Sequence, residues 1–339
     1  METANHRAVW IWLLSGCLLI FLMVVVGGIT RLTHSGLSMV EWKFQGTLPP
    51  LNEQEWNVQF EKYKQSPEYK LVNTDFTLTD FKHIFWWEFT HRMIGRTIGF
   101  VFIIPFLGFL IRKKIPPKFL HKILLLLLLG FCQGLLGWAM VKSGLNKVPH
   151  VSHYLLAAHL ATAFTTFGFT FWFALDLIFP GREERKSRSF RKKILFLLVL
   201  VSTQIVYGAF VAGLKAGLVF SNFPMMGDSW IAPEVFSMRP WWRNLLENGA
   251  GVQFIHRVLA SLIVITTIII FIQSRKLALA SHLQKMIYVL CGAVSLQFLL
   301  GVLTLMLHVP VAIASLHQAG AFLLFSVTLL LFHRFHKLV

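Results

Sequence analysis

The chain is poor in cysteine and in acidic residues, holding three Cys and 15 Asp and Glu among its 339 residues. Cys17, Cys132 and Cys291 each fall inside apolar sequence, where a lone cysteine behaves as a small buried apolar residue. We therefore expect neither a disulfide nor a thiolate metal site. Charged residues make up 14% of the chain, well below the roughly 25% of a soluble domain. This composition excludes an ordinary soluble protein.

Long apolar runs occupy the positions where a soluble protein carries charge. Hydrophobic residues make up 55% of the chain and the mean hydropathy is +0.64. Runs close to the roughly 20 residues that cross a bilayer core recur along the whole sequence. The sequence predicts an all-α polytopic membrane protein with eight transmembrane helices, at residues 8–30, 84–111, 122–142, 151–176, 193–214, 249–273, 285–307 and 309–332.

The placement of basic residues predicts the orientation of these spans. More than half of the 32 Lys and Arg residues lie near the two termini and in the loops at 112–122, 182–193 and 275–285. Lys and Arg accumulate on cytoplasmic loops, so both termini are expected in the cytoplasm. The net charge of +17 is then a topology signal and indicates no nucleic-acid partner. We recognise no targeting leader before the first span, which favours a bacterial cell inner membrane.

The second half of the chain repeats the first. The phrase Glu88-Phe89-Thr90-His91-Arg92 recurs as Gln253-Phe254-Ile255-His256-Arg257, and the first four spans align with the last four. Other matched pairs are Gly27 with Gly208, Gln133 with Gln297, Gly137 with Gly301 and His159 with His317. Parallel repeats predict two four-helix bundles, residues 1–180 and 181–339, related by an axis along the membrane normal.

The first half is longer mainly because of its first outer loop, residues 38–83. In this loop Asn52 stands where it can cap a helix, with Glu55 at the capping-box distance. Trp56, Phe60 and Tyr63 then recur at helical spacing, which predicts a short amphipathic helix over the outer ends of the first bundle. A second short helix is expected to begin after Ser66. The alternative is a solvated loop whose aromatic residues are ordinary interfacial anchors.

Four histidines share one layer of the predicted membrane region: His91, His159, His256 and His317. Each is roughly 9 to 12 Å from the outer surface at 1.5 Å per helical residue. An unpaired imidazole in hydrocarbon is costly, so such residues usually face a bundle interior and have a function. Haem iron accepts imidazole as an axial ligand, which predicts one haem held by a histidine pair in each half. Satisfied structural histidines remain the alternative.

Zinc fits these histidines less well, because a zinc site needs three or four ligands that converge on one ion. The residues beside the histidines favour haem. Arg92 and Arg257 each follow a histidine, and a guanidinium can pair bidentately with a haem propionate. Snorkelling to lipid headgroups is the alternative for both arginines. The glycines of the spans, Gly130, Gly134, Gly137 and Gly301, are expected to allow close approach at the helix walls of the haem pockets, with ordinary helix packing as the alternative. The matched pair His150 and His308 lies at loop edges, where we expect interfacial residues.

One difference between the repeats points to chemistry in the first half. Glu88 is replaced by Gln253, and Thr90 by Ile255. Glu88 stands three residues before His91, so both side chains should lie on one helix face. A carboxylate there can take a proton or stabilise positive charge that develops in a transition state. The alternative is a structural ion pair between Glu88 and Arg92, which are four residues apart.

Taken in order, these motifs make the chain resemble the haem A synthase family over essentially its whole length. Besides the two histidine phrases, the resemblance rests on Gly27-Gly28-Ile29-Thr30-Arg31-Leu32-Thr33, Ser35-Gly36-Leu37-Ser38, Pro67-Glu68-Tyr69-Lys70, Gly95-Arg96, Gln133-Gly134-Leu135-Leu136-Gly137-Trp138, Ala157-Ala158-His159-Leu160, Asn222-Phe223-Pro224-Met225-Met226-Gly227-Asp228 and His317-Gln318-Ala319-Gly320-Ala321.

The resemblance implies oxidation of the C8 methyl of haem o to a formyl group, which gives haem a for terminal oxidases. It implies that His91 and His159 hold the substrate haem, that His256 and His317 hold the iron of a resident haem b, and that Glu88 assists the reaction. Some members carry a cysteine pair in outer loops. This chain has no cysteine there, so it resembles the cysteine-free branch of the family. The absence of this pair argues against a thiol-based redox step.

The implied partners are haem o, membrane lipids, the haem o synthase (a farnesyltransferase) that precedes it, and oxidase assembly factors, although no residue demonstrates the last two. A homo-oligomer is left open. Two other functions fit the repeat and the histidines: a di-haem cytochrome b that passes electrons between quinol and a partner, and a haem carrier.

Overall fold

Eight long apolar helices make up most of the computed structural model, which describes residues 2–41, 46, 48–145, 149–179, 188–277 and 279–336. All eight are long and apolar enough to cross a membrane, which confirms the predicted class. They are α1 (Glu2–Leu32), α4 (Leu78–Ile111), α5 (Pro117–Gly144), α6 (His153–Ile178), α7 (Arg188–Gly213), α8 (Gly249–Lys276), α9 (Ser281–Met306) and α10 (Val311–His336).

Capping side chains lie at the start of α4, α6 and α8, whereas α5 and α9 begin without a side-chain cap. α4 begins at Leu78, ahead of the predicted span, because Thr77 and Asp80 form a capping box in which each side chain bonds to the backbone of the other residue. α8 begins at Gly249, as predicted, after Asn248, whose side chain accepts from the backbone N–H groups of Ala250 and Gly251. Hydropathy predicts the middle of a span, and the cap of α4 explains its earlier start.

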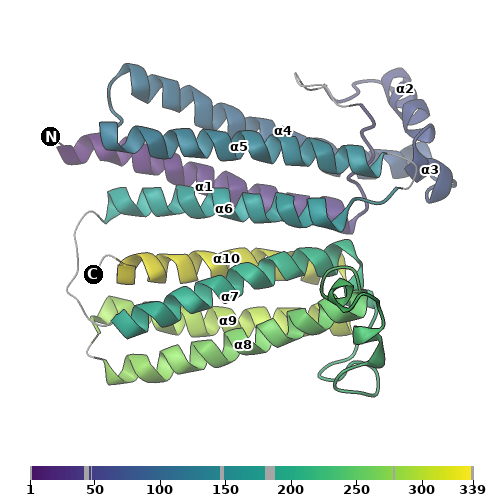
Figure 1. Cartoon of the computed structure of the whole chain (residues 1–339). Helices are drawn as coiled ribbons and strands as arrows, with labels where there is room; N and C mark the ends of the chain where they lie inside the picture. The colour runs from purple at the N-terminus through teal and green to yellow at the C-terminus, as the bar shows by residue number, and fades with distance from the viewer. Residues whose placement is uncertain are drawn as a thin grey trace.

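The helices form two sets of four that lie side by side (Figure 1). In the first set, α1 packs against α4 and α6, and α5 packs against α6; in the second, α7 to α10 close into a ring. The sets meet where α6 packs against α7 and where α1 packs against α10. The start of α1 and the end of α10 lie at the same end of the helices, and α2 and α3 lie at the other (Figure 1). We call the end with α2 and α3 the outer end.

The two sets differ in how they close. α8 and α9 pack along one another, whereas the corresponding helices α4 and α5 hardly touch, although both are fully described. A Cβ atom at Gly130 or Gly134 would meet no atom of the described residues within 4 Å, so open space lies beside these two glycines of α5. The first set is therefore not closed between α4 and α5. That Gly130 and Gly134 allow close approach at the walls of a haem pocket stays a prediction.

Aromatic side chains fill the contact between the two sets. The ring of Phe322 in α10 lies 4.2 Å from that of Phe167 in α6 and 5.2 Å from that of Phe21 in α1, measured between centroids. Phe164 and Phe325 complete the contact, with centroids 5.4 Å apart in an edge-to-face arrangement. Such geometry adds to the free energy of burial. The aromatic contact holds α10 against both α1 and α6.

A helical cap covers the outer end of α4, as predicted. It consists of α2 (Glu53–Lys64) and α3 (Pro67–Leu71). The side chain of Asn52 accepts from the backbone N–H of Glu55 at 2.9 Å, and Ser66 caps α3 in the same way. The buried face of α2 carries Trp56, Phe60 and Tyr63, which pack against Phe81 and Phe85 of α4. The alternative of a merely solvated loop is therefore wrong.

Three short 3₁₀ helices cover the outer end of the second set: η1 (Ala216–Leu218), η2 (Pro233–Phe236) and η3 (Trp241–Leu245). Asn248 holds this segment, because its side-chain amide donates to the carbonyl of Glu234 at 2.6 Å and to Oδ1 of Asn244 at 2.8 Å. The segment exposes Trp230, Phe236 and Trp241. Aromatic side chains at this level suit the membrane interface.

The cap on α4 buries a carboxyl group, Glu68, which is 7% exposed. The Tyr63 hydroxyl donates to Oε2 of Glu68 at 3.1 Å and itself accepts from the side-chain amide of Asn73 at 2.8 Å. Burial raises the pKa of the Glu68 carboxyl from its usual 4.5 to about 7; the bond from Tyr63 opposes the rise, and the negative charge of Glu88 adds to it. Glu68 therefore changes charge near neutral pH.

This raised pKa predicts that the cap loses stability as pH rises. Glu68 binds its proton more tightly in the folded protein than in the unfolded one. Its contribution to the free energy of unfolding is therefore complete below pH 4.5, and about 3 kcal/mol of stability is lost as pH rises through about 7. Glu68→Gln is expected to flatten this dependence, measured by hydrogen exchange of α2 and α3 at pH 5 and pH 8. Glu61→Gln, at an exposed position of α2, is the matched control. An unchanged pH dependence in Glu68→Gln would contradict the prediction.

Candidate functional site

The four predicted histidines lie on four different helices and form two pairs. His91 of α4 and His159 of α6 are close enough to interact electrostatically, and so are His256 of α8 and His317 of α10. Each pair thus belongs to one set of four helices. Within the described part of the chain, no group of three or more His, Cys, Asp or Glu side chains is arranged to hold a metal ion.

A glycine of a neighbouring helix faces each of the four imidazoles, so the ring occupies the space that a side chain would fill. The distances from a Cβ atom built on each glycine to the nearest histidine atom are 2.9 Å for Gly27 to His91 Nε2, 3.2 Å for Gly137 to His159 Cε1, 3.4 Å for Gly208 to His256 Cε1 and 2.9 Å for Gly301 to His317 Cε1. These glycines are repeat partners, so the same arrangement is built twice.

Glutamine amides contact three of the histidines, a contact that was not predicted from the sequence. The amide nitrogen of Gln133 lies 3.3 Å from Nε2 of His159, and that of Gln297 lies 3.1 Å from Nδ1 of His317. Gln204 of α7 lies 3.2 Å from Nε2 of His256, but the residue aligned with it in α1 is Met23. The match of Gln133 with Gln297 in the internal repeat could have indicated that these two glutamines belong to the histidine sites.

These features fit a haem held between two imidazoles. Haem iron takes an axial ligand on each face, and the site supplies histidines in pairs rather than in clusters. Nδ1 of His159 and Nδ1 of His256 are buried without a hydrogen-bond partner among the described residues. Buried polar atoms are normally paired, so an unpaired one calls for an explanation such as an absent ligand. The surrounding helices are apolar, as a macrocycle requires.

Glu88 is 2% exposed and is covered by Ser38 and Met39, which follow α1. Its Oε2 accepts from the hydroxyl of Ser38 at 2.7 Å and from the backbone N–H of Met39 at 2.8 Å. Its Oε1 accepts from Nε of Arg92 at 3.1 Å, so the ion pair that the spacing predicted is present. Ser38 and Met39 were missed because the loop that brings them to Glu88 has no periodic pattern. The carboxylate is thus held in one orientation by hydrogen bonds from three residues.

Gln253 occupies the matching position of the second set without the charge. Its amide donates to the carbonyl of Phe220 at 2.9 Å, while its Oε1 has no partner among the described residues. Both side chains at this position therefore contact the outer segment above them. The carboxylate of Glu88 differs in that it adds a negative charge to the first set alone.

The two arginines that follow the histidines also contact the outer segments. Arg92 donates to the carbonyls of Met39 at 2.9 Å and Glu41 at 3.0 Å, and its side chain is 10% exposed. Arg257 donates to the carbonyls of Asn222 at 3.0 Å and Met225 at 2.9 Å. Arg92 is therefore too buried to snorkel to lipid headgroups. His150 and His308 are exposed, as expected of interfacial residues.

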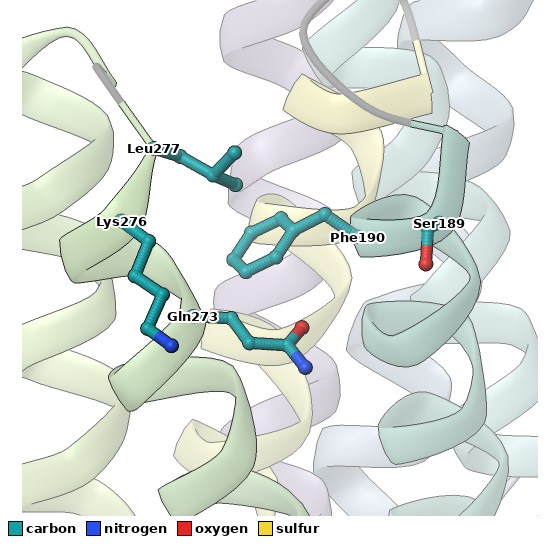
Figure 2. Close-up of a pocket in the computed structure, with 5 residues that line it drawn as sticks. All are labelled: Ser189, Phe190, Gln273, Lys276 and Leu277. Atoms are coloured by element: carbon teal, nitrogen blue, oxygen red, sulfur yellow. The ribbon is translucent and has the colours of Figure 1, made fainter.

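Two surface depressions lie away from the histidine pairs. One, of about 180 Å³, is lined by Ser189, Phe190, Gln273, Lys276 and Leu277 at the inner ends of α7 and α8 (Figure 2). The other lies under η2 and η3, beside Gly251 and Phe254. Neither includes any of the four histidines, and the first is smaller than the roughly 300–1,000 Å³ of a typical ligand pocket. The histidine pairs remain the candidate site.

Comparison with known proteins identifies the family of the chain. The family model COX15-CtaA, described as a cytochrome oxidase assembly protein, matches residues 10–329. The chain is 47% identical to the haem A synthase of Flavobacterium psychrophilum, covering 98% of this chain and 99% of that one. It is 45% identical to the haem A synthase of Nitrosospira multiformis, covering 98% and 95%. It is 43% identical to haem A synthase COX15 of Arabidopsis thaliana, covering 98% and 75%. The chain, a multi-pass membrane protein, therefore belongs to the haem A synthase family.

Proposed function

We propose that this protein oxidises the C8 methyl of haem o to a formyl group and so produces haem a. The observation that carries the proposal is the buried carboxylate of Glu88, which stands three residues before His91 on α4, whereas the uncharged Gln253 holds the matching position before His256. A cytochrome that only passed electrons would have no need of an acid at one pair. Membership of the haem A synthase family supports the same reaction.

The two sets of helices take different roles in this proposal, with residues 1–180 as the substrate half and residues 181–339 as the half with a resident haem b. His91 and His159 would hold the iron of haem o, and His256 and His317 that of haem b. The difference in closure supports this assignment. The second set is a closed ring, which suits a permanently bound group, whereas α4 and α5 hardly touch. A lipid-soluble substrate can then enter from the bilayer between α4 and α5.

Glu88 is proposed to stabilise the reacting methyl. Removing electrons or hydride equivalents from a methyl on a conjugated ring builds positive charge beside the macrocycle. The carboxylate, fixed by Ser38, Met39 and Arg92, presents a negative charge without reorganisation, and low dielectric strengthens its effect. A resident haem b supplies one-electron redox chemistry when bound. Glu88 can also accept a proton that the reaction releases.

Arg92 and Arg257 are proposed to bind haem propionates in addition to holding the outer segments. Each guanidinium has five N–H donors, and Nε of Arg257 is buried without a partner among the described residues. A propionate would find a charge-assisted donor there. Because both arginines also hold outer segments, propionate binding would order those segments.

We place the protein in the bacterial inner membrane with both termini in the cytoplasm. The basic loops support this orientation; residues 180–187, which include part of the most basic loop, lie outside the described residues. Haem o is poorly soluble in water. Direct transfer from haem o synthase and association with oxidase assembly factors are therefore proposed, because both avoid the release of haem o into water.

Pigment analysis tests the proposed function. The protein is purified from cells that make haem o, its pigment is extracted into acidified acetone, and the haems are separated by chromatography. We expect haem b together with hydroxylated or formylated haem. Haem b alone would instead identify a di-haem cytochrome, and little bound pigment would identify a carrier.

A further inference from the structure

One hydrogen bond joins the two sets of helices directly beside a proposed haem ligand. Gln318 follows His317 on α10, and its side-chain amide donates to the backbone carbonyl of Val24 on α1 at 2.7 Å. The residue aligned with Gln318 in the first half is Leu160, which has no side-chain donor. The donor therefore lies in the second set and the acceptor in the first. The repeat provides no equivalent bond from Leu160 to the second set.

Two consecutive glycines of α1, Gly27 and Gly28, leave space for side chains of the two sites. A Cβ atom at Gly28 would lie 2.1 Å from Oε1 of Gln318, closer than real atoms approach, so the Gln318 amide fills the space that Gly28 leaves. A Cβ atom at Gly27 would lie 2.9 Å from Nε2 of His91. The same turn of α1 thus contacts Gln318, the neighbour of one proposed ligand, and His91, a proposed ligand of the other site.

We propose that Gln318 is a positioning residue that lets the resident-haem half set the geometry of the substrate site. By holding α1 against α10, it fixes the distance between Gly27 and the imidazole of His91. This inference rests on the proposed function for the identity of the two sites. It predicts that a change beside His317 alters the distant pair, His91 and His159, more than its own pair.

The physical argument is that apolar helices in a membrane can slide and rotate against one another, because lipid is as apolar as their side chains. A partly buried amide bonded to a backbone carbonyl restricts both motions. The two sets also meet through the aromatic contact between α6 and α10 and through a bond from the Arg31 guanidinium to the carbonyl of Ala212. Loss of the Gln318 bond should therefore shift α1 without separating the sets.

The test uses Gln318→Leu, which copies Leu160, in the purified protein with its resident haem. Haem o is titrated into the protein and followed by visible absorption, while electron paramagnetic resonance reports the ligation of the resident haem. We expect the dissociation constant for haem o to rise about five- to tenfold, because a net hydrogen bond is worth about 1 kcal/mol. The electron paramagnetic resonance signal of the resident haem should stay unchanged. Gly28→Ala is expected to act in the same direction, because its Cβ displaces the Gln318 amide.

Gly320→Ala is the matched control. A Cβ atom at Gly320 would lie 2.3 Å from Oε1 of Gln297, so it produces a comparable clash confined to the second set. We expect it to alter the resident signal and to leave haem o affinity unchanged.

Wild-type affinity for haem o in both Gln318→Leu and Gly28→Ala would overturn the inference, as would a change confined to the resident haem. Failure of the wild-type protein to bind haem o at all would instead overturn the proposed function. Should Gln318→Leu not fold, Gly28→Ala decides the question alone.

Discussion

Replacing Glu88 by glutamine is expected to lower the yield of haem a by roughly 10²- to 10⁴-fold, the usual range for losing a positioned acid or base, while the protein keeps its resident haem. The substitution preserves the shape of the side chain and reproduces Gln253 of the second half. It removes the charge that the proposed reaction needs. The measurement is the ratio of haem a to haem b in pigment extracted from the purified variant.

Ser38→Ala is the control for Glu88→Gln. It removes one of the bonds that hold the Glu88 carboxylate, the 2.7 Å bond from the Ser38 hydroxyl, but leaves the charge and the ion pair with Arg92 in place. We expect a fall in haem a yield of less than about tenfold, since one net hydrogen bond is worth about 1 kcal/mol. A normal yield of haem a from a well-folded Glu88→Gln protein would remove Glu88 from the chemistry.

Substituting the histidines of the two pairs is expected to separate the two sites. His317→Ala should lose its resident haem, because even outer-shell partners of a metal are worth about 10- to 100-fold in affinity and a direct ligand is worth more. His91→Ala should keep the resident haem and lose binding of added haem o. The haem content per chain and the spectral titration with haem o measure the two effects separately.

His150→Ala serves as the matched control for the histidine series, because His150 is exposed at a loop edge. It should leave the haem content and haem o binding at wild-type values. Equal loss of resident haem in His91→Ala and His317→Ala would mean that the four histidines form one shared site, contrary to the proposal.

The sequence predicted the spans because a span must be apolar over its buried length. It pointed to the four histidines because an imidazole inside a span needs a partner; their common depth stays a prediction. The start of α4 at Leu78 was not predicted, since it depends on the Thr77 and Asp80 side chains rather than on hydropathy. The cap helix α2 was predicted correctly because Asn52 and its aromatic face give both a start signal and a period.

The less regular parts of the candidate site could not be predicted. Ser38 and Met39 reach Glu88 through a loop, and no helical period relates them to Glu88, which is 50 and 49 positions away. The amide of Gln318 lies beside Gly28 only because α1 and α10 pack together, a contact between the two halves that the internal repeat does not encode. The sequence therefore showed which residue differs between the repeats, but not the contacts that loops and helix packing bring to it.

The contact between α1 and α10 also bears on how the protein is made. Val24 and Gln318 are 294 residues apart, so at about 5–20 residues per second the ribosome needs on the order of 15 to 60 seconds to deliver the second partner after the first. Gly27 can meet His91 as soon as α4 has been inserted, whereas the space beside Gly28 waits for the Gln318 amide. The contact that fixes α1 against the second set therefore forms only near the end of translation, after the helix that carries His91 has entered the membrane.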